Sequence, residues 1–190
     1  MALIKARPVA GDPALGDAFL KLVAPFVYRR SVDYSAIGEI RAMKDRVNAK
    51  VGRDQETFRH VKLGYGGIRE VEFVVQTFQL LYGAGDPWIR EPNTLRALRR
   101  LADREHITGD EHATLASAYT FLRTVEHRLQ ILHYLQTHTL PTDQEGLMKL
   151  ARRLGYSADR WPDPADGLPA RLSAAYPGRP TGIRLSVEGA

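Results

Sequence analysis

The sequence predicts a mainly α-helical protein, a bundle of about six helices preceded by one short strand. Apolar residues recur at spacings of three and four through most of residues 12–156, which is the period of a helix that buries one face. Residues that cap helix starts precede several of these stretches, and only residues 2–7 form a short apolar run that suggests a strand. A length of 190 residues with 44% hydrophobic and 26% charged residues suits one folded domain with a sizeable core.

The absence of cysteine excludes several classes of site. A chain without cysteine cannot form disulfides, thiolate nucleophiles, iron–sulfur clusters or cysteine-ligated zinc sites, and it suits a reducing, cytosolic setting. The longest stretches without Asp, Glu, Lys or Arg run to about 14 residues, short of the roughly 20 that a membrane-spanning helix needs. The N-terminus also lacks the apolar core of a secretory signal. We therefore expect a soluble, cytoplasmic protein with a mildly basic net charge of +5 and no membrane partner.

An apolar run and two prolines define the N-terminal elements. The predicted strand at residues 2–7 has no obvious partner later in the sequence, which suggests a missing neighbour. Asp12 can accept hydrogen bonds from the first amides of a helix and Pro13 suits the first helical position, which predicts a helix over residues 13–24. Pro25 either kinks this helix or starts a second short one. A further helix is predicted over residues 34–49, where apolar residues are spaced by three, three and four.

A glycine-rich turn leads into the most apolar helix. Residues 61–67, Val-Lys-Leu-Gly-Tyr-Gly-Gly, are followed by an apolar stretch that predicts a helix from Ile68 to about Tyr82. Apolar residues occupy most of its circumference, so we expect this helix at the buried centre of the bundle. Its few polar residues fall on one narrow stripe: Arg69, Glu72, Gln76 and Gln79.

Three further helices complete the predicted bundle. Asn93 is expected to cap the first, which has leucines on one face. Thr108 with Glu111, and Thr142 with Glu145, have the spacing of capping boxes. They predict a long helix to about residue 136 and a final helix that ends near residue 155.

The C-terminal residues differ in composition from the rest. Residues 157–190 are rich in proline and glycine and show no helical or strand period, which predicts a poorly ordered tail. The predicted organisation is therefore a strand segment over residues 1–11, a helical domain over residues 12–156 and a tail over residues 157–190.

The carboxylates and histidines do not form a metal-binding pattern. Nucleotidyl and phosphoryl transfer with divalent metals commonly needs an Asp-x-Asp pair, and the chain has none. Glu70 and Glu72 are close in sequence, but two helical positions differ by about 200°, so they are expected to face opposite sides. The six histidines lack the His-x-x-x-His spacing of a zinc site and are expected at the surface or the edge of the core. The sequence thus predicts neither a catalytic residue nor a metal ligand.

One segment has the composition of an anion site. Glycines let backbone amides turn toward a ligand, a helix N-terminus adds positive potential, and lysine and arginine add full charges, a combination that suits a phosphate group. The candidate nucleotide- or phosphate-binding residues are Lys62, Gly64, Gly66, Gly67 and Arg69. The segment matches neither the Walker pattern nor Gly-x-Gly-x-x-Gly, and a tight loop in which only glycine fits is the alternative explanation.

Three other groups of polar residues each allow two interpretations. Glu70 either complements the helix dipole or pairs with a buried partner such as an arginine. A polar stripe on the long helix is either a solvated face or a docking face for another domain: Arg123, Glu126, Gln130 and His133. The arginines at positions 96, 99, 100 and 104 could suggest nucleic acid, but no aromatic platform or known nucleic-acid-binding signature accompanies them.

Five segments taken together carry a resemblance to a known family. They are Lys62-Leu63-Gly64-Tyr65-Gly66-Gly67-Ile68-Arg69-Glu70-Val71-Glu72-Phe73, residues 2–12, Pro25-Phe26-Val27-Tyr28-Arg29-Arg30, Phe121-Leu122-Arg123 with Glu126-His127-Arg128-Leu129-Gln130, and Gln136-Thr137-His138-Thr139-Leu140-Pro141. They resemble glutamine synthetase adenylyltransferase, the bifunctional bacterial enzyme that attaches AMP to a tyrosine of glutamine synthetase and removes it. The resemblance covers about residues 2–156, and the segments at 25–30 and 136–141 are more similar to the deadenylylating half.

The resemblance implies a helical region of a larger nucleotidyltransferase. In that family a nucleotidyltransferase domain carries the metal-binding aspartates and a helical domain follows it. This chain resembles only the last strand of the first domain plus the helical domain, and the family's Gly-Ser-Asp and Asp-x-Asp elements have no match. We therefore expect a fragment that is inactive alone, from a transferase of nitrogen metabolism. The full-length enzyme would use Mg2+ with ATP, ADP or phosphate, none of them held by this chain alone.

The resemblance also implies a reaction and roles for several residues. Phosphate would attack adenylyl-tyrosine in line and release ADP, with the helical part closing one wall of the cleft. The glycine amides, with Lys62 and Arg69, would face the phosphates. In supporting roles, Glu70 or Glu72 would orient an arginine or lysine, and Lys5 and Arg7 would face the cleft.

The implied partners are glutamine synthetase, a PII-type signalling protein and the missing nucleotidyltransferase domain, with no nucleic acid. Two alternatives stay open. One is a non-catalytic module that binds glutamine synthetase, a PII-type regulator or the other half of the enzyme. The other is the helical part of a PII uridylyltransferase, whose glycine turn is similar, although the run from Arg69 to Phe73 favours the adenylyltransferases.

Overall fold

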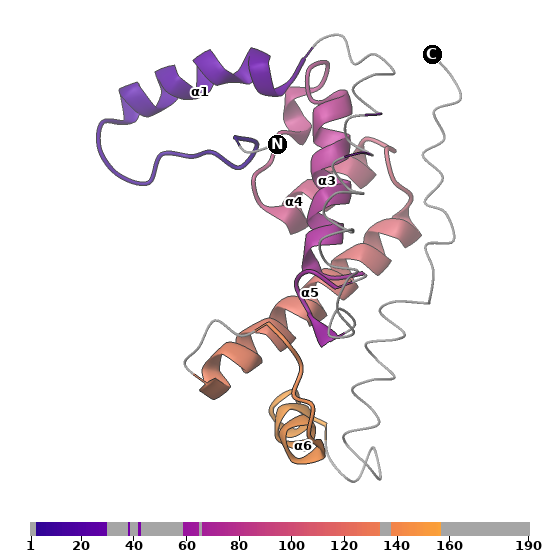
Figure 1. Cartoon of the computed structure of the whole chain (residues 1–190). Helices are drawn as coiled ribbons and strands as arrows, with labels where there is room; N and C mark the ends of the chain where they lie inside the picture. Colours follow the sequence, from indigo (N-terminus) through magenta and orange to yellow (C-terminus); the bar gives the residue numbers. More distant parts are fainter. Residues whose placement is uncertain are drawn as a thin grey trace.

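The computed structural model describes residues 3–29, 38, 42, 59–64, 66–133 and 138–156, and these residues are mainly helical (Figure 1). The helices are α1 (Pro13–Val27), α3 (Ile68–Tyr82), α4 (Thr94–Asp103), α5 (Gly109–His133) and α6 (Gln144–Arg153), with the short 3-10 helix η2 (Pro87–Ile89) before α4. None of the helices in these ranges is both long and apolar enough to cross a membrane. The mainly helical class predicted from the sequence is confirmed.

Two predicted elements fall outside the described residues. The helix expected over residues 34–49 is described only at Gly38 and Ala42, both helical, and the tail over residues 157–190 is not described. The long helix is described as far as His133, so its predicted extension to residue 136 also lies outside.

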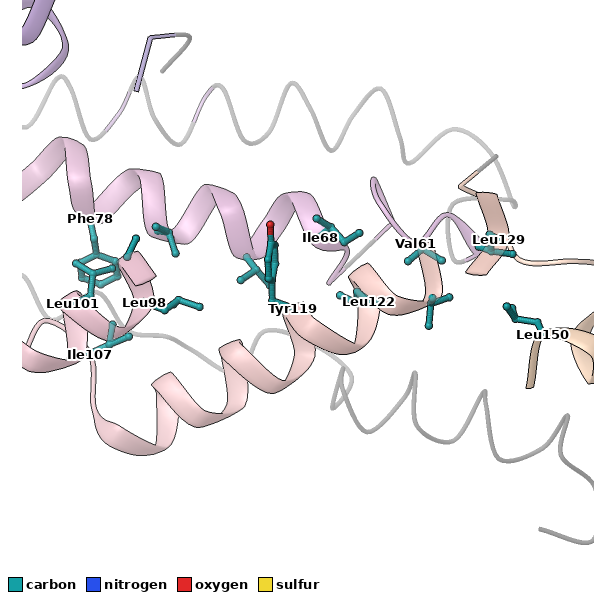
Figure 2. Packing of buried hydrophobic residues seen from close by; sticks show 14 of the residues in the cluster. Val61, Ile68, Phe78, Leu98, Leu101, Ile107, Tyr119, Leu122, Leu129 and Leu150 are labelled. Atoms are coloured by element: carbon teal, nitrogen blue, oxygen red, sulfur yellow. The ribbon is translucent and has the colours of Figure 1, made fainter. Parts of the chain in front are cut away.

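The core lies where α3, α4 and α5 pack against one another. Figure 2 shows Leu98 and Leu101 of α4 and Leu122 of α5 on the side toward α3, and all three are almost completely buried. Burial of each such side chain stabilises the fold by about 1.5–3 kcal/mol. The helix α6 packs on α5, with Leu150 fully buried at that end. α3 contacts both α4 and α5, but Phe73, Val74 and Leu80 are only half-buried, so it is not enclosed all round.

Side chains fix most helix starts where the sequence places them. Asp12 accepts a hydrogen bond from the first turn of α1 at 2.8 Å, and Asn93 does the same for α4 at 3.0 Å. The capping box of α5 forms in both directions: the Thr108 amide donates to Glu111 Oε2 at 2.8 Å, and the Glu111 amide donates to Thr108 Oγ1 at 3.2 Å. These N-terminal caps fix the residues at which α1, α4 and α5 begin.

The start of α6 differs from the predicted capping box of Thr142 and Glu145. Asp143 caps this helix, because its Oδ1 accepts a hydrogen bond from the Gly146 amide at 2.7 Å. Asp is at least as good a cap as Thr, so the helix begins one residue later than the box predicts. The hydrogen bond favours the ionised carboxyl and lowers the pKa of Asp143.

The N-terminal segment is a turn and not the predicted strand. The Ala6 amide donates to the Leu3 carbonyl at 3.0 Å, and no strand among the described residues pairs with residues 3–10. A strand needs a neighbour to satisfy its backbone groups, so the apolar run alone does not produce one. The segment is held instead by Ile4, which is buried, and by the side chain of Lys5.

Helix α1 exposes an apolar face. It runs without interruption through Pro25, which lies in its last turn, and none of its residues is buried. Exposed Leu15, Phe19, Leu22 and Phe26 are spaced by four, three and four, so they share one face. Figure 1 shows α1 lying apart from α3, α4 and α5. Beyond its end, the Tyr28 ring packs against the Arg90 guanidinium, 4.5 Å from the ring centroid.

Residues 59–61, where the glycine-rich turn begins, lie alongside residues 138–140, before α6. The Val61 amide donates to the His138 carbonyl at 2.8 Å, and the Leu140 amide donates to the Arg59 carbonyl at 2.9 Å. His60 and Thr139 form an isolated antiparallel bridge at the same place. This pairing brings together two segments that are far apart in the sequence, and both lie next to α5.

Candidate functional site

The glycine-rich turn uses its own amides to close on itself. The Gly64 amide donates to the His60 carbonyl at 2.7 Å, and the Gly67 amide donates to the Gly64 carbonyl at 2.8 Å. The Gly66 amide donates to Glu70 Oε2 at 2.9 Å. All three glycine amides that the sequence suggested for a phosphate therefore have acceptors within the chain. Contact of these amides with an anion stays a prediction, and it would require the anion to replace their present acceptors.

The turn needs glycine for steric reasons at two positions. Gly66 has φ +71°, a conformation that other residues rarely adopt. At Gly67 an added Cβ would lie 2.7 Å from the Lys62 carbonyl oxygen and 2.8 Å from that of Gly64. The backbone at Gly67 packs against backbone on the opposite side of the turn, so no side chain can be accommodated there without movement.

Glu70 closes the turn from within the helix. Its contact with the Gly66 amide at 2.9 Å supplies an acceptor in the first turn of α3, whose N-cap Gly67 has no side chain for this task. The carboxylate also lies at the positive end of the helix. Of the two interpretations of Glu70, the structure supports the local role at the helix start, and it shows a backbone amide as the partner.

The turn places its two basic residues beside each other. The Arg69 amide donates to the Lys62 carbonyl at 3.1 Å, which joins the start of α3 to the beginning of the turn. Arg69 is exposed, and the Lys62 side chain is 36% exposed, so both remain accessible to a solute. Lys62 Nζ lies 3.7 Å from Glu126 Oε1, on α5.

Glu126 is the residue at this site whose role sequence reasoning missed. Its side chain is only 3% exposed, which excludes the interpretation of its helix stripe as a solvated face at this position. Arg123 Nη1 donates to Glu126 Oε2 at 2.7 Å, and His138 Nδ1 lies 3.1 Å from Oε1 without the alignment of a hydrogen bond. We call these four residues, Glu126, Lys62, Arg123 and His138, the Glu126 cluster. It joins α5, the glycine-rich turn and the segment before α6.

The neutral form of His60 is built into the turn. His60 Nδ1 accepts a hydrogen bond from the Leu63 amide at 3.0 Å, which only an unprotonated nitrogen can do. Burial lowers the pKa of His60, and the nearby His138 and Lys62 lower the pKa further, against smaller opposing effects of a backbone hydrogen bond and of Glu126. The His60 and His138 rings lie 5.8 Å apart between centroids. The turn therefore favours neutral His60.

Lys5 and Glu72 meet on the other side of α3. Lys5 Nζ lies 3.2 Å from Glu72 Oε1 and donates to Thr94 Oγ1 at 3.2 Å. Tyr119 of α5 donates its hydroxyl to the same Glu72 oxygen at 3.1 Å, and burial, with a contribution from Glu72, raises the pKa of Tyr119 although a bond to Thr94 opposes this. Glu72 thus holds a lysine at a junction of the N-terminal segment, α3, α4 and α5. Arg7 is exposed, and the structure gives it no partner among the described residues.

The two carboxylate sites are linked along α5. The Arg123 guanidinium, which binds Glu126, also lies over the Tyr119 ring, 5.8 Å from its centroid. Tyr119 in turn binds Glu72. Glu72 contacts Tyr119 and Lys5, whereas Glu70 contacts the Gly66 amide, so the two carboxylates face different sides of α3, as their helical spacing predicts. Successive contacts thus form a line of polar side chains: Lys5, Glu72, Tyr119, Arg123, Glu126 and Lys62.

The arginines in α4 and at its C-terminal end all have carboxylate partners within the chain. Glu91, which is buried, pairs with Arg96 at 3.2 Å and with Arg100 at 3.0 Å. Arg99 pairs with Asp103 at 3.0 Å, and Arg104 pairs with Asp86 at 2.7 Å. These arginines do not form a free basic surface of the kind that binds a phosphate backbone.

The described residues do not fit a magnesium site. Mg2+ needs several oxygen ligands, and no group of three or more His, Asp or Glu side chains in the described ranges is arranged to hold a metal. Cations already surround Glu126, and Glu72 is paired with Lys5. No step of the function proposed below runs through a metal held by these residues.

Comparison with known proteins shows the family of this helical domain. The sequence from residue 41 to residue 172 matches the family model described as GlnD PII-uridylyltransferase. The chain belongs to the family that this model describes.

Curated relatives name a more particular enzyme. The chain is 47% identical over 157 residues to the bifunctional glutamine synthetase adenylyltransferase/adenylyl-removing enzyme of Mesorhizobium japonicum. It is 48% identical over 157 residues to the enzyme of that name in Xanthobacter autotrophicus, and 46% identical over 155 residues to that in Nitrosococcus oceani. Each match covers 82% of this chain and 16% of the relative, so the chain spans about a sixth of the length of these proteins. The resemblance that the five sequence segments indicated is confirmed.

We expect Gly67→Ala to destabilise the protein by about 1–3 kcal/mol, because the new methyl group would overlap two carbonyl oxygens. Gly109→Ala is the matched control. Gly109 is the first residue of α5, has open space where a Cβ would lie and should be neutral or slightly stabilising as alanine. Urea unfolding followed by circular dichroism measures both. Equal stability of the two variants would contradict the steric role of Gly67.

Lowering the pH from about 7.5 to about 5.5 should destabilise the protein partly through His60. The folded pKa of His60 lies below the ordinary value of 6.5, so the folded state binds a proton less readily than the unfolded state. This stabilising contribution is present above pH 6.5 and is lost as the pH falls through the folded pKa.

Urea titrations at both pH values, with two variants, measure this effect. His60→Gln should reduce the loss of stability, whereas His127→Gln, at an exposed position of α5, should keep it. His106, whose pKa burial also lowers, leaves part of the pH dependence in both variants. An unchanged pH dependence in His60→Gln would show that His60 does not titrate with folding.

Proposed function

We propose that this chain is the helical region of an enzyme that adenylylates and phosphorolytically deadenylylates glutamine synthetase. The observation that carries the proposal is 44–48% identity to relatives of that name over 82–87% of the chain. The chain matches only one region of these relatives. We therefore propose that it contributes to the activity of the whole enzyme as one of its parts. The proposal makes the chain a component of a transferase, with glutamine synthetase as its partner.

The proposed reaction is transfer of an adenylyl group to phosphate. A phosphate oxygen attacks the phosphorus of adenylyl-tyrosine, the bond between phosphorus and the tyrosine oxygen breaks, and the tyrosine oxygen takes up a proton, which gives ADP and tyrosine. The described residues offer no clustered carboxylates for this chemistry. Their contribution would be electrostatic, because the accessible cations Lys62, Arg69 and Arg7 suit negatively charged phosphate groups.

We assign the chain to the deadenylylating side of the enzyme. The segments at residues 25–30 and 136–141 are more similar to that half of the family. The proposal also includes a PII-type signalling protein as a regulator and a cytoplasmic location, which suit an enzyme that controls glutamine synthetase.

A non-catalytic interaction module is the second candidate, and helix α1 favours it. Four large apolar side chains on one exposed face of α1 have no cover among the described residues. Such faces commonly mark contacts with another protein or domain. In this case the chain would bind glutamine synthetase without contributing to the transfer step.

A segment exchange tests the first candidate directly. The 157 residues of the Mesorhizobium japonicum relative that match this chain would be replaced by the corresponding residues of this chain. Release of ADP from adenylylated glutamine synthetase with phosphate and Mg2+ measures adenylyl removal, and incorporation of AMP from ATP measures the opposite activity. We expect the exchanged enzyme to keep adenylyl removal within about tenfold of its parent, a difference of about 1.4 kcal/mol in transition-state stabilisation.

Two controls separate the candidates. Replacing the same segment by a flexible glycine- and serine-rich linker should abolish adenylyl removal and affect adenylylation less. The 190-residue chain alone should release no ADP. Release of ADP by the chain alone would contradict its proposed dependence on another domain. A folded but inactive exchanged enzyme, together with binding of this chain to glutamine synthetase, would favour the interaction module.

A further inference from the structure

The Glu126 cluster contains more positive charge than a structural ion pair needs. Lys62 and Arg123 both approach the single carboxylate of Glu126, at 3.7 Å and 2.7 Å. No other carboxylate among the described residues forms an ion pair with either of them. One carboxylate neutralises one cation, so the cluster has a surplus of one positive charge even when His138 is neutral.

The surplus charge is accessible, whereas the carboxylate is not. The Glu126 side chain is 3% exposed, but those of Lys62 and Arg123 are 36% and 41% exposed. A solute can therefore reach the two cations without meeting the negative charge that holds them. Keeping a carboxylate buried is costly unless its partners are well placed, so the position of the cations is coupled to that of Glu126.

The two cations approach different oxygens of the same carboxylate. Lys62 Nζ lies nearest to one oxygen of Glu126, and Arg123 Nη1 binds the other. The Tyr119 ring beneath the Arg123 guanidinium restricts this side chain further. A guanidinium has five N–H donors, so Arg123 keeps donors for a second partner. An ammonium next to a guanidinium is a combination that binds the oxygens of a phosphate group.

We propose that Lys62 and Arg123 bind a phosphate group of inorganic phosphate or ADP, and that Glu126 is the positioning residue that holds them for this task. This inference rests on the proposed function, in which phosphate is consumed and ADP is formed. It assigns the phosphate contact to side chains from two elements, the glycine-rich turn and α5. The glycine amides keep their structural bonds in this arrangement.

Titration of the 190-residue chain with inorganic phosphate, and separately with ADP, tests the binding pair. Nuclear magnetic resonance signals of the Arg123 side chain and of the amides at residues 62–64 should shift saturably with either ligand, and adenosine should produce no shift. Lys62→Gln and Arg123→Gln should each weaken binding about tenfold. Lys149→Gln and Arg99→Gln, which remove exposed cations paired elsewhere, should leave the affinity unchanged.

Glu126→Gln distinguishes a positioning role from a purely electrostatic one. Removal of a negative charge near an anion site strengthens binding when the site keeps its geometry. A positioning role predicts the opposite, namely binding about fivefold to tenfold weaker in Glu126→Gln, with partial recovery in Glu126→Asp. Thermal unfolding confirms that each variant is folded at the temperature of the titration. Unchanged or tighter binding in folded Glu126→Gln would overturn the positioning role.

Failure of this inference can be told apart from failure of the proposed function. Absence of a saturable shift in the unaltered chain, or equal loss of binding in Lys149→Gln and Arg99→Gln, would overturn the phosphate site. Because the binding titration uses neither glutamine synthetase nor the exchanged enzyme, an active exchanged enzyme would then still support the proposed function. Arg123→Gln keeps the test valid if Glu126 variants do not fold, since the Arg123 side chain is 41% exposed whereas that of Glu126 is 3% exposed.

Discussion

A buried carboxylate requires cationic partners, and at Glu126 this requirement determines how three parts of the chain meet. The cations are Lys62 of the glycine-rich turn and Arg123 of α5, and the His138 ring, from the segment before α6, lies beside the same carboxylate. Backbone bonds between residues 59–61 and 138–140 reinforce the same junction. The Coulombic attraction at Glu126 offsets the cost of burying its charge only while all of these segments stay in place. The junction therefore links the fold to the place where the chain presents free positive charge.

The second carboxylate, Glu72, extends this arrangement to the N-terminal segment. It holds Lys5 and Tyr119, and the Tyr119 ring lies beneath the Arg123 guanidinium that binds Glu126. The two sites thus share α5 as a common support. This line of residues follows the contact between α3 and α5, with Lys5 at one end and Lys62 at the other. Both lysines would be available to a neighbouring catalytic domain, if the chain acts next to one as proposed. The exposed apolar face of α1 lies outside this line and provides a separate surface.

The helices could be predicted from the sequence because their signals are local. The apolar period of residues 68–82, the Asn93 cap and the capping box at Thr108 each involve residues within one or two turns, and the structure confirms them. The strand at residues 2–7 was wrong because an apolar run cannot show whether a partner strand exists. The cap of α6 was misplaced because Asp143 and Thr142 are adjacent and both suit the position.

The site was harder to predict because its contacts join distant segments. Glu126 appeared to belong to a solvated stripe, since periodicity alone does not show what packs on a helix face. Its burial depends on residues 59–64 and 138–140, which no local pattern connects to α5. The glycines of the turn suit both a phosphate-binding and a structural interpretation; the structure shows acceptors within the chain for their amides, and their contact with an anion stays a prediction. The available signal was the position of Glu126 itself, four residues after Leu122 and three before Leu129, which places it beside the apolar stripe of α5.

Amide hydrogen exchange in Glu126→Gln tests the central role of this carboxylate most directly. The account predicts that the amides of Val61 and Leu140, which join the two segments at the junction, exchange about tenfold faster than in the unaltered chain, a loss of about 1.4 kcal/mol of local stability. The amide of Leu101 in α4, away from the junction, should keep its protection. Unchanged exchange at Val61 and Leu140, or equal acceleration at all three amides, would contradict the account.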